Sequence, residues 1–324
     1  MQKIWLGIFW KVLSCGCFAG VNILVRFLSG GSPAAMLSPL PIYSIMFFQN
    51  LISMLFLFAI LSKRAGQAKQ ERGLLQFKLT KIRNPWLQLL RILTATIGIG
   101  VWYLSLRYIP IPQAVAISFI APVITTISAV LILKERLYWQ KKLAIAFSMI
   151  GGFFIARPDQ ALMNISTYHW CIVLPIIASL LFALDKVLTR KLLINQETPS
   201  NLAGYLFIFM CPLCLIPCIK YGWVTPQLQQ WPWLLLLGIL GAIAHYTFNK
   251  AYALAEITAL LPFGIARLIL SASLSFVFFA EIPNTLDMWL GISIVAVSTV
   301  LLGQDKKSSY FKPKQTLSPA KGIG

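Results

Sequence analysis

The sequence predicts an all-α integral membrane protein with ten transmembrane helices arranged as two inverted five-helix repeats. Three observations predict this fold class: a scarcity of charged residues, ten apolar runs of membrane-spanning length, and a one-sided distribution of lysine and arginine. Of the 324 residues, 58% are hydrophobic and only 11% are charged, whereas soluble domains carry about 25% charged residues. The chain therefore has too little polar surface to fold in water.

The ten apolar runs each have the length of a membrane-spanning helix, which needs about 20 residues. They cover residues 7–27, 41–61, 87–107, 111–133, 139–157, 170–188, 202–219, 231–249, 257–279 and 286–303. The third and fourth runs are joined by Ile109-Pro110-Ile111-Pro112. Proline is tolerated at a helix start and disfavoured in its interior, so this motif predicts a hairpin.

The basic residues explain both the net charge of +19 and the orientation. With a cytoplasmic N-terminus, Arg26, Arg107, Arg157 and Lys220 fall outside, Arg267 lies within a span, and the other lysines and arginines fall inside. Cytoplasmic loops hold an excess of lysine and arginine. The pattern therefore predicts a multi-pass protein of the cytoplasmic (inner) membrane with both termini in the cytoplasm, and no nucleic-acid binding.

An internal repeat appears when the chain is shifted by 146 residues. The fourth apolar run then coincides with the ninth, Ile111 with Ile257, and Glu135 with Glu281. Five spans are an odd number, so the second half must insert upside down relative to the first, which is typical of transporters. The predicted parts are a first repeat over residues 1–157, an external linker over 158–169, a second repeat over 170–303 and a basic cytoplasmic tail over 304–324.

The pattern resembles the drug/metabolite transporter superfamily, in particular its EamA-type ten-helix members and, among them, the S-adenosylmethionine uptake carriers. The residues that carry the resemblance are Arg91, Tyr108, Pro110, Ala114, Ala116, Pro122, Glu135, Gly151, Gly152, Ala251, Tyr252, Pro262, Glu281 and Gly291. The resemblance implies a carrier of amino acids, nucleotide-like metabolites or lipophilic compounds. Two positions depart from it: Gln49 stands where many relatives have arginine, and Arg267 stands where many have glutamate.

Catalytic and metal sites are not predicted. The chain has two histidines, His169 and His245, and lacks the HExxH and GxSxG motifs. The nine acidic residues lie in loops or toward the ends of the predicted helices. We therefore expect no enzyme, no metal, no cofactor, and no carboxylate beside Arg267. The absence of a carboxylate at mid-membrane favours facilitated exchange over proton coupling.

Polar and aromatic residues inside the spans predict a substrate-binding cavity lined by Trp102, Ser118, Thr125, His245, Asn249 and Arg267. Pro122 and Pro262 are predicted to break the fourth and ninth helices, and broken helices mark binding sites in transporters. Three alternatives stay open. In the first, the two prolines only kink their helices for packing. In the second, Trp102 belongs to an interfacial aromatic belt. In the third, Arg267 is structural and donates hydrogen bonds to helix carbonyls near Ser118.

The predicted function is a secondary transporter that works by alternating access. Its small-molecule substrate is expected to bear an anionic group for Arg267, as an amino acid or an S-adenosylmethionine-like metabolite does. A channel-type facilitator and a membrane-embedded enzyme are the alternatives. The lipid bilayer is the expected surrounding, and the sequence leaves open whether two chains form a homodimer.

Overall fold

The computed structural model describes residues 2–30, 38–68, 82, 84–118, 121–133, 171 and 173–279, with short pieces at 139, 142–143, 145–147, 149–150, 290 and 293–294. All regular elements in these ranges are helices, which confirms the all-helical class. The α-helices are α1 (Gln2–Leu28), α2 (Ile42–Ala68), α3 (Pro85–Tyr108), α4 (Ile111–Ile117), α5 (Ala121–Leu133), α8 (Val173–Ile194), α9 (Pro199–Tyr221), α10 (Trp231–Leu254), α11 (Ile257–Leu260) and α12 (Ala266–Phe279). Short 3-10 helices cover Leu228–Gln230 and Pro262–Ile265.

Five helical segments in the described part of the chain are long and apolar enough to cross a membrane. They are Ile4–Leu28, Ile42–Ile60, Pro85–Tyr108, Pro199–Tyr221 and Leu228–Leu254. Two further predicted spans are divided into shorter helices, and α8 carries Asp185, Lys186, Arg190 and Lys191. Most of 139–157 and 286–303, together with the linker 158–169 and the tail 304–324, lies outside the described residues. The number ten stays a prediction.

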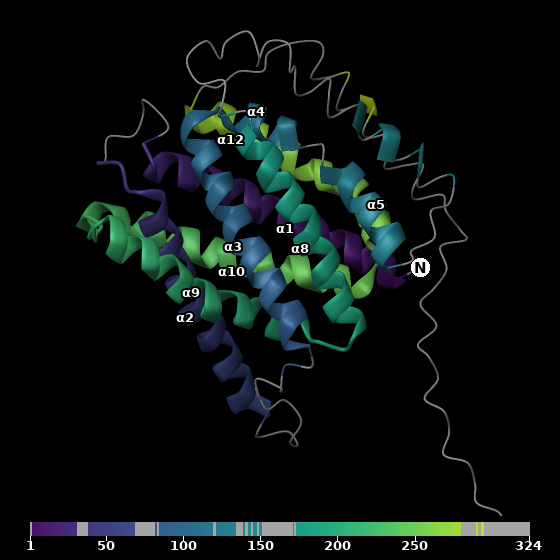
Figure 1. The fold of residues 1–324 in the computed structure, drawn as a ribbon, viewed down its shortest axis with the longest axis horizontal. Helices are drawn as coiled ribbons and strands as arrows, with labels where there is room; N and C mark the ends of the chain where they lie inside the picture. Colours follow the sequence, from purple (N-terminus) through teal and green to yellow (C-terminus); the bar gives the residue numbers. More distant parts are fainter. Residues whose placement is uncertain are drawn as a thin grey trace, which may run out of the picture.

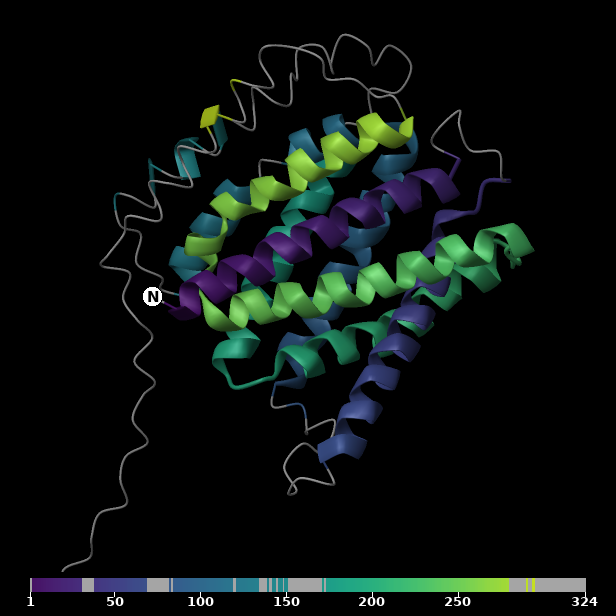
Figure 2. The same ribbon diagram turned by 180° about the vertical axis from the view of Figure 1, so that it is seen from behind.

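The helices form two packed layers. Helix α3 lies against α8, and α5 also packs on α8, in the layer nearest the viewer in Figure 1. Behind it, α12, α1 and α10 lie side by side, as Figure 2 shows from the opposite side. Helix α2 packs on α9 and α10 at one edge of the two layers. The core between the layers is where side chains from distant parts of the sequence meet.

Glycines allow neighbouring helices to approach closely. A Cβ atom on Gly238 of α10 would lie 2.5 Å from Ile52 of α2, and one on Gly98 of α3 would lie 3.1 Å from Phe182 of α8. Near Gly238, the Ser53 hydroxyl donates a hydrogen bond of 2.7 Å to the Gly238 carbonyl. Small residues let helix backbones approach and bond in lipid, where the hydrophobic effect does not draw helices together.

The predicted hairpin between the third and fourth runs is confirmed, because α3 ends at Tyr108 and α4 begins at Ile111. The carbonyls at the end of α3 need donors from outside the helix. Arg26 of α1 supplies them, since its guanidinium donates to the Leu106 carbonyl at 3.0 Å and to the Ile109 carbonyl at 2.6 Å.

The predicted break at Pro262 is present, because the ninth run consists of α11, the 3-10 turn that begins at Pro262, and α12. The fourth run is described as α4 and α5, and Pro122 is the second residue of α5. Residues 119–120 lie outside the described residues, so the break at Pro122 stays a prediction. Just after α4, the Ser118 carbonyl accepts a hydrogen bond of 3.4 Å from the Ser179 hydroxyl of α8. At the Pro262 break, Arg267 becomes the second residue of α12, in its first turn.

Candidate functional site

A cavity of about 90 Å³ lies between the two layers. Five helices meet there: α1, α3, α8 and α10 each contribute residues at the spacing of one helical face, and α12 contributes Arg267. The lining residues are Phe18, Val21, Asn22, Ala95, Ile99, Trp102, Tyr103, Phe182, Asp185, Lys186, His245, Phe248 and Arg267. Residues three and four positions apart on a helix share one face, and this periodicity explains how four long helices turn these side chains inward.

Arg267 is held by one amide and two aromatic rings. Its guanidinium donates a hydrogen bond of 3.2 Å to the Asn22 side-chain oxygen. The guanidinium carbon lies 5.2 Å from the ring centre of Phe18 and 5.1 Å from that of Trp102, within the range of cation–π attraction. Its buried Nε atom has no hydrogen-bond partner in the described part of the chain. A guanidinium has five N–H donors, so the group has capacity left for an acceptor.

Asn22 connects the two layers at this point. Its side-chain oxygen accepts from the Trp102 indole nitrogen at 3.0 Å as well as from Arg267. Its amide nitrogen donates to the Ser271 hydroxyl at 3.4 Å. A single amide of α1 therefore orients the arginine of α12 and the tryptophan of α3.

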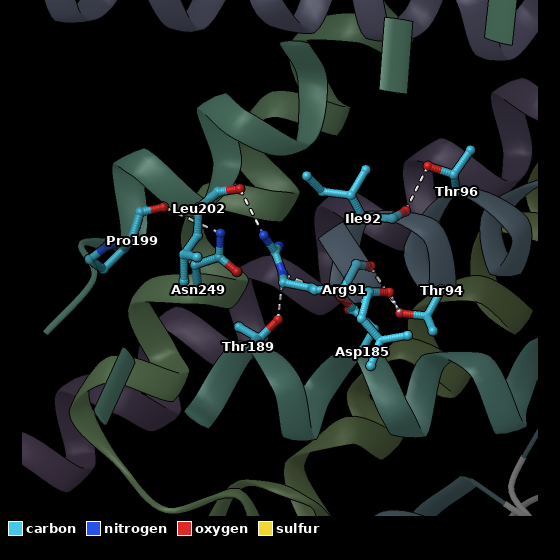
Figure 3. Close-up of polar contacts among 10 residues, drawn as sticks. Arg91, Ile92, Thr94, Thr96, Asp185, Thr189, Pro199, Leu202 and Asn249 are labelled. Atoms are coloured by element: carbon cyan, nitrogen blue, oxygen red, sulfur yellow. Dashed lines mark hydrogen bonds and ion pairs between the residues drawn. The ribbon is translucent and has the colours of Figure 1, made fainter. Parts of the chain in front are cut away.

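Asp185 gives the cavity a carboxylate (Figure 3). Its Oδ1 atom lies 3.4 Å from the Nε atom of Arg91, a side chain that is only 1% exposed. Arg91 donates its hydrogen bonds elsewhere, to the Thr189 hydroxyl at 2.8 Å and to the Leu202 carbonyl at 2.9 Å. Arg91 of α3 thus ties α8 to α9, and Asp185 faces it as a counterion without taking a hydrogen bond at Oδ1.

The walls of the cavity are aromatic. The ring of His245 meets those of Phe18 and Phe207 nearly at right angles, with centres 5.2 and 5.6 Å apart. Trp102 meets Phe182 edge to face at 6.2 Å. Mostly apolar walls with a few placed polar groups are typical of small-molecule sites.

The structure brings together three of the six predicted site residues: Trp102, His245 and Arg267 all line the cavity. Trp102 is 2% exposed, so the interfacial-belt alternative is wrong. Arg267 donates its hydrogen bond to Asn22, and within the described ranges it forms none with a carbonyl near Ser118.

The other three predicted residues lie elsewhere. Ser118 donates to the Val115 carbonyl at 2.6 Å, and Asn249 donates to the Pro199 carbonyl at 3.3 Å. Thr125 is fully buried, and its hydroxyl lacks a partner among the described residues. None of these three belongs to the lining of the cavity.

Sequence reasoning missed Asp185 and Lys186 as lining residues. Asp185 lines the same cavity as Arg267, yet its ion pair is with Arg91, and no described carboxylate forms an ion pair with Arg267. The available signal was periodicity: Phe182, Asp185 and Lys186 are spaced for one helix face. The glutamates of the repeat, Glu135 and Glu281, lie outside the described residues.

This arrangement, a bundle of apolar helices around a charged and aromatic internal cavity, defines a membrane transporter. The profile of the EamA-like transporter family matches residues 5–157 and 169–304. The chain therefore belongs to the EamA-like transporter family, within the drug/metabolite transporter superfamily.

Curated relatives agree with this assignment. A riboflavin transporter of Rhizobium johnstonii is 26% identical over 95% of this chain and 94% of its own length. A riboflavin transporter of Vibrio cholerae is 30% identical over 67% of this chain and 70% of its own. An S-adenosylmethionine uptake transporter of Rickettsia bellii is 24% identical over 70% of this chain and 76% of its own. All three are named as transporters, which confirms the prediction of a transporter and not an enzyme.

The fold also matches a solved structure. One crystal structure superposes with a TM-score of 0.68 at 15% identity, covering 93% of this chain and 96% of that one. This similarity shows a shared fold.

Proposed function

We propose that this chain is a secondary transporter that carries small metabolites bearing an anionic group across the cytoplasmic membrane by alternating access, with both termini in the cytoplasm. The observation that carries the proposal is Arg267, which faces an internal cavity with an aromatic lining and retains donor capacity. An arginine within a membrane span is costly and marks a functional site by default.

The helix bounds support two inverted five-helix repeats. Pro85 and Trp231, which begin α3 and α10, are 146 positions apart, as are Tyr108 and Leu254, which end them. The starts of α4 and α11 keep the same offset. Helix α1 packs on α10 and α8 packs on α3, so the first helix of each proposed half packs on the third helix of the other half. We propose residues 1–157 and 170–303 as the repeats, joined by the linker 158–169 and followed by the tail 304–324.

The size of the cavity supports alternating access. Pockets that hold cofactor-sized ligands have volumes of about 300–1,000 Å³, whereas this cavity has about 90 Å³. A metabolite with a ring system would enter only if the layers move apart. The helix break before α12 is a place where such a movement changes few backbone hydrogen bonds.

The substrate we propose is an amino acid or an S-adenosylmethionine-like metabolite. Arginine binds a carboxylate through two parallel hydrogen bonds. Trp102 and Phe182 offer ring faces and edges to the rest of the molecule. Riboflavin and S-adenosylmethionine, the compounds in the names of the relatives, both contain a heteroaromatic ring system that such walls suit.

The test is counterflow in proteoliposomes. Vesicles loaded with unlabelled compound are diluted into labelled compound, with amino acids, riboflavin and S-adenosylmethionine tested separately. A carrier accumulates label transiently and saturates, while a channel shows neither property. Empty vesicles are the control. A linear, unsaturable flux or a single-channel current would contradict the proposal.

A further inference from the structure

The charges around the cavity do not balance. Asp185, Lys186 and Arg267 line it, and Arg91 lies 3.4 Å from Asp185. Three positive groups and one negative group leave two positive charges in excess, whichever of the cations Asp185 neutralises. Lys11 adds to the positive electrostatic potential of the cavity, because its ammonium lies 5.1 Å from the ring centre of Phe248, a lining residue.

Lys186 and Arg267 carry this excess. Asp185 is the counterion of Arg91, and the part of the chain that the structure describes places no carboxylate within ion-pair distance of Lys186 or Arg267. Arg267 is bonded to a neutral amide, and no described residue forms a hydrogen bond with the Lys186 ammonium. Buried charges are stable when they are paired. A second partly buried cation without a counterion among the described residues is therefore a feature for which the fold alone gives no reason.

We propose that the cavity selects an organic dianion: a metabolite with an aromatic ring and a doubly charged group, such as a phosphate monoester, bound between Lys186 of α8 and Arg267 of α12. The proposal rests on the transport function proposed above and narrows its substrate class. A phosphate monoester carries about −1.5 to −2 charges at pH 7, which matches the excess. Its oxygens accept hydrogen bonds from both cations, and the ring packs on Trp102 and Phe182.

The direct test compares two probes that share one ring. Riboflavin and riboflavin 5′-phosphate differ only in the phosphate, and quenching of flavin fluorescence reports the binding of each to purified protein. The wild-type protein should bind the phosphate ester about 10- to 100-fold more tightly, the effect of one charge-assisted hydrogen bond. Equal affinity for the two probes, or no binding of riboflavin 5′-phosphate, would overturn the proposal.

Variants of Lys186 test the contribution of its charge independently of that of Arg267. Lys186→Gln should reduce the affinity for riboflavin 5′-phosphate about 10-fold or more and leave that for riboflavin within about twofold, whereas Lys186→Arg should retain most of the preference. Lys250→Gln is the matched control, because Lys250 lies 3.9 Å from the ring centre of Trp10 and does not line the cavity. Thermal unfolding confirms that each variant is folded. An equal loss of affinity for both probes in Lys186→Gln would show a structural lysine and refute the dianion site.

Counterflow measurements in proteoliposomes distinguish a failure of the dianion proposal from a failure of the proposed transport function. Saturable counterflow of a neutral or zwitterionic compound that is unaffected by Lys186→Gln would leave the transporter standing and refute the dianion. Absence of counterflow for every compound, together with tight binding of riboflavin 5′-phosphate, would refute the transport function and retain the binding site.

Discussion

Replacing Asn22 separates the structural role of Arg267 from its proposed role in binding. Asn22 accepts hydrogen bonds from Trp102 at 3.0 Å and from Arg267 at 3.2 Å. Asn22→Leu keeps the branched shape of the side chain and removes the oxygen that accepts both bonds, together with the amide that donates to Ser271. Hydrogen bonds between membrane helices contribute about 0.6 kcal/mol on average and at most about 1.7. The loss of all three bonds should therefore lower the free energy of unfolding by about 2–5 kcal/mol.

Asn22→Asp has the opposite signature. The carboxylate keeps both acceptor contacts and supplies Arg267 with a counterion, so the stability should stay within about 1 kcal/mol of the wild type. The same counterion competes with the anionic group of the substrate. We expect the affinity for the transported compound to fall about 10- to 100-fold, which corresponds to the loss of a charge-assisted hydrogen bond of about 1.5–3 kcal/mol.

The assay is thermal unfolding of purified protein with and without the compound that gives counterflow, combined with a direct binding measurement. Thr96→Val is the control, because the Thr96 hydroxyl donates to the Ile92 carbonyl of its own helix and does not line the cavity. If Asn22→Asp binds the compound as the wild type does, Arg267 does not pair with the substrate. If Asn22→Leu unfolds at the wild-type temperature, the bonds of Asn22 do not hold this site together.

Three further predictions follow from the helix contacts and the charge distribution. Arg267→Lys should remain folded and lose most transport, because an ammonium cannot form the two-point contact of a guanidinium; transport within twofold of wild type would exclude that contact. Gly238→Ala should lower the free energy of unfolding by about 1–3 kcal/mol, because the added Cβ would lie 2.5 Å from Ile52 of α2. Gly264→Ala is the matched control in the thermal unfolding experiment and should be neutral, because open space surrounds Gly264. In a cysteine-free protein, an impermeant maleimide applied to whole cells should label Thr225→Cys and spare Gln67→Cys; the reverse pattern would contradict the proposed orientation.

The sequence predicts the skeleton of this protein better than its cavity. Apolar run length, the Ile109–Pro112 hairpin and the break at Pro262 are local features, and each recurs in the structure. Trp102, His245 and Arg267 are also predicted correctly as neighbours, because an offset of 146 residues relates α3 to α10 and a charge within a span must face inward.

The errors concern the direction in which polar side chains point. Ser118 and Asn249 resemble cavity residues in the sequence, yet each hydrogen bonds to a backbone carbonyl. Serine and asparagine within helices commonly bond to nearby backbone groups, and run length gives no information on this. The predicted span closes at residue 188, which places Asp185 near a helix end, whereas α8 continues to Ile194. The inward direction of Asp185 depends on Arg91, a partner almost a hundred positions earlier.

The repeat offset has a consequence for how a molecule travels through the protein. Position 91 corresponds to Leu237 and position 267 to Ala121 under the same shift of 146, so the two halves share a backbone plan while their charges differ. Under the proposed repeat, the two ends of the cavity are therefore not chemically equivalent. In the transport cycle that we propose, an occupant with one charged end would be held in a single orientation. The same end of the molecule would lead when it enters and when it leaves. The charges, and not the arrangement of the helices, would fix this orientation.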